Sequence, residues 1–241
     1  MAKYPSVLEA REQIVEIGRR MYQKGFVAAN DGNISCRIGP DRILTTPTGV
    51  SKGFMTLGMI VEMNLQGEVL SENGYKPSSE VKMHIRAYRE NPDIMAVLHA
   101  HPPVSTSFAI AGIALDKPIL TEALLSLGSV PVARYATPGT NEVPDSIAPF
   151  VKEYNAVLLA NHGALTWGDS LMQAYFRMET MECYASIMIN LGYLTGKAKE
   201  LSADQVCALL DTRAKLGVKG GGFPACPEDA TNQYDVLPAS Q

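Results

Sequence analysis

The feature that most constrains the fold is the stretch Ala96–Pro103, in which an apolar run ends in two histidines one residue apart. Side chains in a β-strand alternate between faces, so a strand here places His99 and His101 on the same side. On a helix the two imidazoles would diverge by about 200°. The two prolines that follow end the strand. We therefore expect a rigid strand that aims two imidazoles at one point.

Such a pair is half of a metal site. Catalytic zinc usually has three protein ligands and an open position, and imidazole is one of its favoured ligands. His162 follows a second apolar run, Ala156–Ala160, and Glu80 lies near the start of a predicted helix. Three imidazoles and a carboxylate make a candidate zinc set. The alternative for His99 and His101 is ordinary hydrogen bonding at a strand end, and the two-histidine motif alone does not decide between them.

Length, composition and net charge limit the domain organisation and the classes of partner. The 241 residues are 46% hydrophobic, which supports one substantial domain over residues 1–216, and the glycine-, proline- and polar-rich residues 217–241 are expected to form a mobile tail. A net charge of −4 gives no general attraction to nucleic acid or to an anionic membrane. The start lacks an apolar signal core, and no apolar run approaches the ~20 residues of a membrane span. We expect a cytoplasmic protein without nucleic-acid or membrane partners.

Hydrophobic periodicity predicts alternating helices and strands. The expected strands are residues 34–37, 43–46, 61–65, 94–101, 130–133 and 156–160. The expected helices lie between residues 6 and 25, 76 and 91, 104 and 111, 144 and 153, 171 and 191, and 202 and 217. Capping boxes at residues 6–9 and 202–205 start the first and the last of them. Glu80 then lies in the first turn of the second helix. Residues 115–127 show no clear periodicity.

A second group of residues suits an anion. Small donors, glycine and a helix N-terminus together bind phosphate without lysine. The candidates are Asn33, Thr48, Gly49, Ser78 and Ser79. Each alone is weak, because Ser and Asn at turns and caps usually have structural roles. Ser78 and Ser79 directly precede Glu80, however, so an anion site and a metal ligand are neighbours in the chain.

Five motifs in a fixed order resemble the class II aldolase/adducin family between about residues 8 and 192. They are Gly32-Asn33-Ile34-Ser35, Thr46-Pro47-Thr48-Gly49, Ser78-Ser79-Glu80, His99-Ala100-His101-Pro102 and Asn161-His162-Gly163. The resemblance implies an α/β/α sandwich around a mainly antiparallel sheet, and a homotetramer with its sites between subunits. It also implies a zinc ion, or Mn²⁺ or Co²⁺ in its place, on His99, His101, His162 and Glu80.

The activity implied is that of a zinc-dependent aldolase. Such an enzyme cleaves a ketose 1-phosphate, for example fuculose 1-phosphate or a 5-deoxypentulose 1-phosphate, to dihydroxyacetone phosphate and an aldehyde. The five anion-binding candidates named above map to the phosphate site, and Glu80 maps to the catalytic acid/base. Glu122 stands where the fuculose-type enzyme has a tyrosine from the neighbouring subunit. It is either a second proton-transfer group or a solvated surface charge. Tyr234 is a second candidate for that role.

Three alternatives remain open at this stage. Two are enzymes of the same family, a sugar-phosphate 4-epimerase and a methylthioribulose-1-phosphate dehydratase. The resemblance gives the epimerases an aspartate after the serine pair and a lysine at the Thr46 position, so Glu80 and Thr46 favour an aldolase. The third is a non-enzymatic interaction module like the adducin head, which lacks a complete metal set. His84, four residues after Glu80, is either a support for that carboxylate or an ordinary packed or surface histidine.

Overall fold

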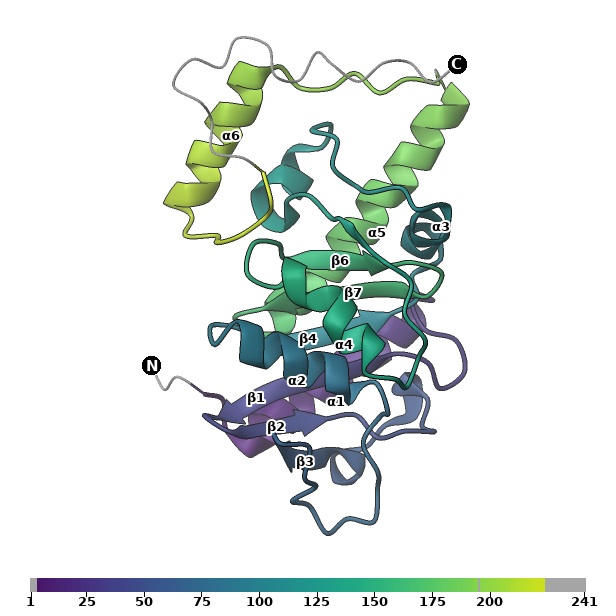
Figure 1. The fold of residues 1–241 in the computed structure, drawn as a ribbon, viewed down its shortest axis with the longest axis vertical. Coiled ribbons are helices and arrows are strands. Elements are labelled where there is room, and N and C mark those ends of the chain that lie inside the picture. Colours follow the sequence, from purple (N-terminus) through teal and green to yellow (C-terminus); the bar gives the residue numbers. More distant parts are fainter. Residues whose placement is uncertain (1–3, 195, 224–241) are drawn as a thin grey trace.

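The computed structural model describes residues 4–194 and 196–223. Its centre is a seven-stranded sheet in the order β3-β2-β1-β4-β7-β6-β5 (Figure 1). Every neighbouring pair is antiparallel except β5 and β6, which are parallel. The expected mainly antiparallel sheet is thus confirmed. The strands are β1 (Asn33–Gly39), β2 (Arg42–Thr45), β3 (Val61–Asn64), β4 (Ala96–Ala100), β5 (Val132–Ala133), β6 (Ala156–Leu159) and β7 (Gly163–Gly168).

Helices cover both faces of the sheet. Figure 1 shows α2 and α4 in front of it, with α1 and α5 behind. The sheet packs on α1, α3 and α5 through one apolar cluster and on α2 and α4 through another. This is the expected α/β/α sandwich. The helices are α1 (Val7–Gln23), α2 (Val81–Glu90), α3 (Pro103–Ala111), α4 (Glu142–Ile147), α5 (Leu171–Leu194) and α6 (Ala203–Lys215).

Both predicted capping boxes are present. Ser6 accepts a hydrogen bond from the Glu9 amide and the Glu9 carboxylate accepts one from the Ser6 amide, which starts α1. Ser202 and Gln205 start α6 in the same way. These reciprocal bonds satisfy amides that have no partner inside a helix, so local sequence was sufficient to locate both helix starts.

The start of α2 differs from the expectation. The helix begins at Val81, and Glu80 is its N-cap residue rather than part of the first turn. The preceding residues are used elsewhere, because Pro77 forms a β-bridge with Pro47 and the Ser78 amide donates to the Thr46 carbonyl at 3.3 Å. This pairing brings the two predicted phosphate-binding loops together.

Strand β7 was not predicted. It lies between β4 and β6 with both of its faces buried, so its residues show no alternation of polar and apolar side chains. Glycines at both ends obscure it further. Residues 115–127 contain an isolated bridge from Leu115 to Val130 and a short π-helix, Ala123–Leu127. Both depend on contacts distant in sequence, which explains the absence of a local signal.

The beginning of the expected tail lies against the domain. The Gly221 carbonyl accepts a hydrogen bond from the Ser129 amide, and the Gly221 amide donates one to the Glu153 backbone carbonyl, each at 2.7 Å. The domain boundary at residue 216 remains a prediction, and residues 224–241, with Tyr234, lie outside the described residues. Among the helices that the structure describes, none has the length and hydropathy required to cross a membrane.

Candidate functional site

Strand order brings the histidines together. Strands β4 and β6 are each antiparallel to β7, which lies between them, so both end at the same edge of the sheet. His99 lies on β4, His101 immediately after it, and His162 in the turn from β6 to β7. Asn161 makes that turn in the left-handed region (φ 58°), which asparagine tolerates better than most residues.

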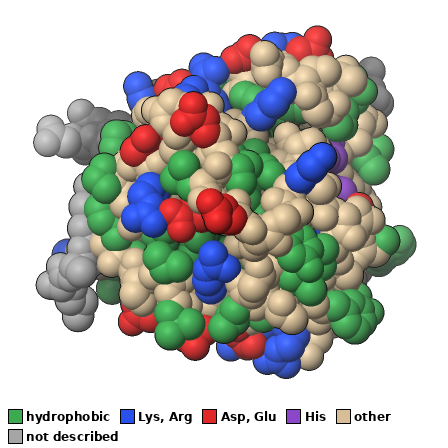
Figure 2. Space-filling view, turned by 90° about the horizontal axis from the view of Figure 1, so that it is seen from below, with side chains coloured by type: hydrophobic (Ala, Val, Ile, Leu, Met, Phe, Trp, Pro, Cys, Tyr) green, Lys and Arg blue, Asp and Glu red, His purple; other side chains and the backbone are tan. Residues whose placement is uncertain are grey.

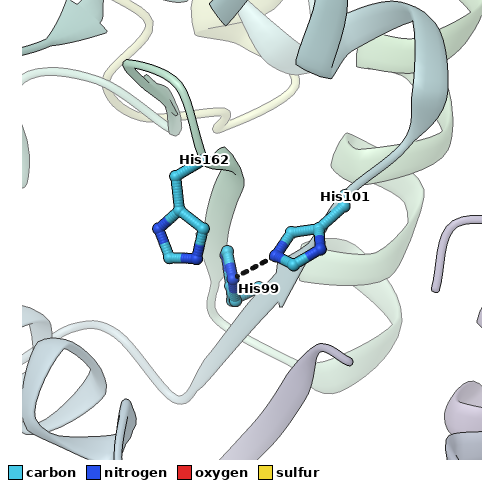
Figure 3. A group of neighbouring side chains, drawn as sticks. All are labelled: His99, His101 and His162. Carbon is cyan, nitrogen blue, oxygen red and sulfur yellow. Dashed lines mark hydrogen bonds between the residues drawn. The ribbon is translucent and has the colours of Figure 1, made fainter. Parts of the chain in front are cut away.

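The three imidazoles converge on one point (Figure 3). Their ligand atoms all lie within 4.8 Å of one another, and the Nε2 atoms of His99 and His101 are 3.1 Å apart. Two nitrogens bound to a tetrahedral zinc at 2.0–2.1 Å would be about 3.3 Å apart. The His99 Nδ1 lies 2.9 Å from the Ala164 carbonyl, which fixes the proton on Nδ1 and leaves Nε2 free as a ligand. The donor set therefore fits a divalent metal.

Glu80 faces this cluster. Its carboxylate oxygens lie 3.0 Å from His162 Nε2 and 3.5 Å from His99 Nε2. Asn33 Nδ2 donates to Glu80 Oε2 at 2.7 Å. Burial alone would raise the pKa of Glu80, but the two histidines and the Asn33 amide outweigh burial and hold this pKa well below its usual range. An ionised carboxylate in this position suits a fourth ligand.

His99 and His101 are held in the form that metals bind. Burial lowers the pKa of His99 to about 3. Burial also lowers the pKa of His101, and the neighbouring His162 lowers it further. Both imidazoles are therefore neutral near pH 7, as metal ligation requires.

A pocket of about 340 Å³ opens beside the cluster. Of two larger depressions, one adjoins this pocket at Ser78 and Ser79, but neither is lined by a histidine. Histidine side chains reach the surface at one edge of the face in Figure 2. The pocket lining includes all the predicted phosphate-binding residues and, except for the buried His99, all the predicted metal ligands. They are Asn33, Thr48, Gly49, Ser78, Ser79, Glu80, His101 and His162.

The predicted phosphate site has fewer free backbone amides at the start of α2 than we expected. The Glu80 amide donates to Ser78 Oγ at 3.3 Å, and the Val81 amide donates to the Ser78 carbonyl at 3.1 Å. These two amides at the start of α2 are therefore already paired. The side-chain hydroxyls and amides therefore remain as candidate donors for an anion.

Lys52 is a pocket residue that the sequence did not reveal. Its ammonium donates to the carbonyls of Asn30 (2.9 Å), which also lines the pocket, and Val50 (2.8 Å), and only 1% of the residue is exposed. Burial lowers the pKa of Lys52 to about 8, against the opposing influence of Asp31 and Glu80. No local pattern distinguished this lysine from a surface one.

Glu122 does not line the pocket. It is exposed, at the start of the π-helix. The structure of one chain therefore brings together all the predicted metal and phosphate residues but not Glu122. His84, by contrast, is fully buried, and its Nε2 lies 2.5 Å from Asn33 Oδ1.

Known proteins resemble this chain over most of its length. Residues 12–189 match the family model of the class II aldolase and adducin N-terminal domain. The chain is 32% identical over 212 residues to the 3-oxo-tetronate 4-phosphate decarboxylase of Pectobacterium atrosepticum, covering 86% of this chain and 95% of that protein. It is 30% identical over 207 residues to the L-fuculose phosphate aldolase of Escherichia coli, with the same shares.

A solved structure agrees with these similarities. YgbL from Klebsiella pneumoniae superposes with a TM-score of 0.79 at 32% identity, covering 85% of this chain and 99% of that one. The family includes lyases and decarboxylases of sugar phosphates, which are typically metal dependent. The chain belongs to the class II aldolase and adducin N-terminal domain family.

Proposed function

We propose that this protein is a zinc-dependent carbon–carbon lyase that forms the enediolate of dihydroxyacetone phosphate from a phosphorylated keto compound. The observation that carries the proposal is the convergence of three imidazoles and Glu80 beside a pocket lined with hydroxyl and amide donors. Mn²⁺ and Co²⁺ are alternatives for the metal, because imidazole and carboxylate also bind them.

We assign a separate role to each group of residues in the pocket. His99, His101 and His162 would hold the metal, which acts as a Lewis acid and stabilises negative charge on the substrate's oxygens. Asn33, Thr48, Gly49, Ser78 and Ser79 would bind the phosphate. Glu80 would transfer the proton at the carbon where the bond breaks. An anionic substrate beside this carboxylate raises its pKa toward the range that proton transfer needs.

Decarboxylation is the reaction we favour. In 3-oxo-tetronate 4-phosphate, breaking the C1–C2 bond releases CO₂ and leaves its electron pair in an enediolate over C2 and C3. Protonation at C2 then gives dihydroxyacetone phosphate. One acid/base suffices, and Glu80 meets that need. The relative from Pectobacterium atrosepticum, named for this reaction, supports the choice.

Aldol cleavage is the second candidate. A ketose 1-phosphate, such as fuculose 1-phosphate or a 5-deoxypentulose 1-phosphate, would give the same enediolate when its C3–C4 bond breaks. The departing aldehyde requires a further proton transfer at the C4 hydroxyl. Glu122 of a neighbouring subunit is our candidate for that transfer. Similarity to the Escherichia coli L-fuculose phosphate aldolase favours this reaction.

We further propose a cytoplasmic homotetramer with sites between its subunits. A tetramer would place residues of a neighbour, Glu122 among them, at the open side of each pocket. The substrate is a small sugar phosphate, in keeping with the family.

Product analysis tests the function. The zinc-loaded protein is incubated with 3-oxo-tetronate 4-phosphate and, separately, with a panel of ketose 1-phosphates. Dihydroxyacetone phosphate is followed by its NADH-coupled reduction, and CO₂ and aldehydes are measured directly. We expect dihydroxyacetone phosphate with CO₂, and none from the His162→Ala variant. An aldehyde instead of CO₂ indicates the aldolase, an epimerised sugar the epimerase, and a diketone phosphate from methylthioribulose 1-phosphate the dehydratase. No turnover of any compound contradicts a lyase and favours the interaction module.

A further inference from the structure

A continuous chain of hydrogen bonds leads from the core to Glu80. The Tyr88 hydroxyl lies 2.7 Å from Ser35 Oγ, and Ser35 Oγ lies 2.7 Å from His84 Nδ1. His84 Nε2 lies 2.5 Å from Asn33 Oδ1, and Asn33 Nδ2 donates to Glu80 at 2.7 Å. Ser35, His84 and Asn33 are each 0% exposed, so water does not compete for these contacts.

The residues of this hydrogen-bond chain follow the regular spacing of a helix and of a strand. Glu80, His84 and Tyr88 are spaced four residues apart and share one face of α2 and its cap. Asn33 and Ser35 are two residues apart on β1 and share the face of the sheet that α2 covers, where Asn33 pairs with His99 of β4. The polar side chains on this face of α2 therefore point toward the polar side chains on this face of β1.

The protons in this chain have one consistent arrangement. Burial lowers the pKa of His84 to about 3, so the imidazole is neutral and carries one N–H. The Asn33 amide directs Nδ2 at Glu80 and Oδ1 at His84, so the N–H must be on Nε2. Nδ1 then accepts from the Ser35 hydroxyl, which in turn accepts from Tyr88.

The orientation of the Asn33 amide matters because its two ends have almost the same shape. A flipped amide would place Oδ1 against the Glu80 carboxylate, where two acceptors repel. The correct orientation also directs Nδ2 at Ser78 Oγ, 3.4 Å away. Only the hydrogen-bond partners select between the two orientations.

We propose that His84 is a positioning residue, whose Nε2–H holds the Asn33 amide in the orientation that directs Nδ2 at Glu80. Asn33 in turn keeps the Glu80 carboxylate aimed at the three histidines. The inference rests on the proposed function in one respect, the role of Glu80 as a metal ligand and proton-transfer group. Partners that orient ligating groups commonly contribute 10- to 100-fold in metal affinity or activity.

Two substitutions separate positioning from packing. In His84→Gln the amide nitrogen reaches the place of Nε2 and can donate to Asn33 Oδ1. In His84→Asn the shorter side chain reaches only the place of Nδ1, so the donor to Asn33 is lost. We expect His84→Asn to weaken Zn²⁺ binding, measured by chelator competition, and kcat/KM, each by about 10- to 100-fold. His84→Gln should keep most of both.

A double-mutant cycle tests whether His84 acts through Asn33. Asn33→Leu removes both ends of the amide. If His84 acts through that amide, His84→Asn adds little further loss of Zn²⁺ affinity in the Asn33→Leu background. Tyr184→Phe is a matched control, because it removes a different buried hydroxyl, which donates to the Lys117 carbonyl at 2.6 Å. It should lower the melting temperature and leave Zn²⁺ affinity unchanged.

Three results would overturn the inference. They are unchanged Zn²⁺ affinity in His84→Asn, an equal loss in His84→Gln, and losses in the double variant that multiply those of the single variants. Melting temperatures measured alongside identify a His84 variant that merely fails to fold. In that case Ser35→Ala is used instead, because it removes the donor to His84 Nδ1. We expect it to lower Zn²⁺ affinity by less than His84→Asn does. The affinity measurements need no substrate. If the wild-type protein turns over no compound, the proposed function fails while these results still decide the role of His84.

Discussion

At the scale of single residues, Glu80 has two proposed roles that need opposite protonation states. A metal ligand must be ionised, and the contacts of Glu80 with His99, His162 and Asn33 favour that form. A general acid must carry a proton. The conflict is resolved if the substrate displaces the carboxylate from the metal, because three histidines already suffice for a catalytic zinc.

Glu80→Gln separates the two roles. The glutamine cannot exchange a proton in the reaction, but the three imidazoles remain. We expect most of the bound zinc to be retained and turnover to fall by a factor of about 10² or more. Metal analysis and kcat measure the two effects. Glu12→Gln, at an exposed position of α1, is the control and should change neither. Near-native turnover in Glu80→Gln would remove the residue from the mechanism.

From the lowered pKa of Lys52 we expect anion binding to depend on pH. Its pKa of about 8, lowered by burial, means that the ammonium is charged below pH 8 and neutral above it. A phosphate monoester is already a dianion there, since its second pKa is about 6. Affinity for glycerol 3-phosphate should therefore fall as the pH rises through 8. Calorimetric titration of the zinc-loaded protein measures this fall.

Lys52→Met is the matching variant. It should bind glycerol 3-phosphate more weakly at pH 7 and show no further fall above pH 8. The same decline in the variant as in the wild-type protein would show that another group is responsible.

At the scale of elements, the sequence predicted what local patterns encode. Capping boxes located α1 and α6, and strand alternation placed His99 and His101 on one face. The missed features depend on distant partners. Strand β7 has no alternation because both of its faces are buried, and the start of α2 is delayed by pairing between residues 46–47 and 77–78. Likewise, only the folded chain places Lys52 in the pocket and His84 against Asn33.

Gly32 tests how tightly β1 must approach the metal-bearing strand. A Cβ at this position would lie 2.9 Å from the His99 carbonyl oxygen and 2.6 Å from Val27 Cγ1, with φ at +75°. Gly32→Ala should therefore destabilise the fold by about 2 kcal/mol or more and reduce zinc binding. Chemical denaturation and metal analysis measure the two effects.

Gly74→Ala is the matched control for Gly32→Ala. Gly74 has a similar φ of +78°, but a Cβ there would meet no heavy atom of the described residues within 4 Å. The variant should lose only about 1 kcal/mol, the cost of the backbone conformation, and keep its zinc. Equal losses in both variants would show that close packing at Gly32 is not required.

At the scale of the whole molecule, one chain carries the predicted metal and phosphate residues at a single pocket and the histidine cluster beside it. Glu122 lies outside that pocket in the same chain. A contribution from Glu122 to catalysis therefore requires a neighbouring subunit. We expect light scattering to give about four times the mass of one chain.

Glu122→Gln tests the contact between subunits. If Glu122 serves the aldehyde-forming transfer, its loss should lower kcat for a ketose 1-phosphate and leave decarboxylation and bound zinc unchanged. Of the two proposed reactions only aldol cleavage needs this proton transfer, so the ratio of their rates is the measurement. A Glu122→Gln variant with near-native rates for both would make the residue an ordinary surface charge.

The central claim is that a metal held by His99, His101 and His162 drives release of dihydroxyacetone phosphate. The most direct measurement is the rate of that release before metal removal, after chelation, and after Zn²⁺ is added back, with metal content determined at each stage. The account predicts that the rate falls to background in the metal-free protein and returns as zinc approaches one ion per subunit. Full-rate release by protein shown to be free of metal would contradict it.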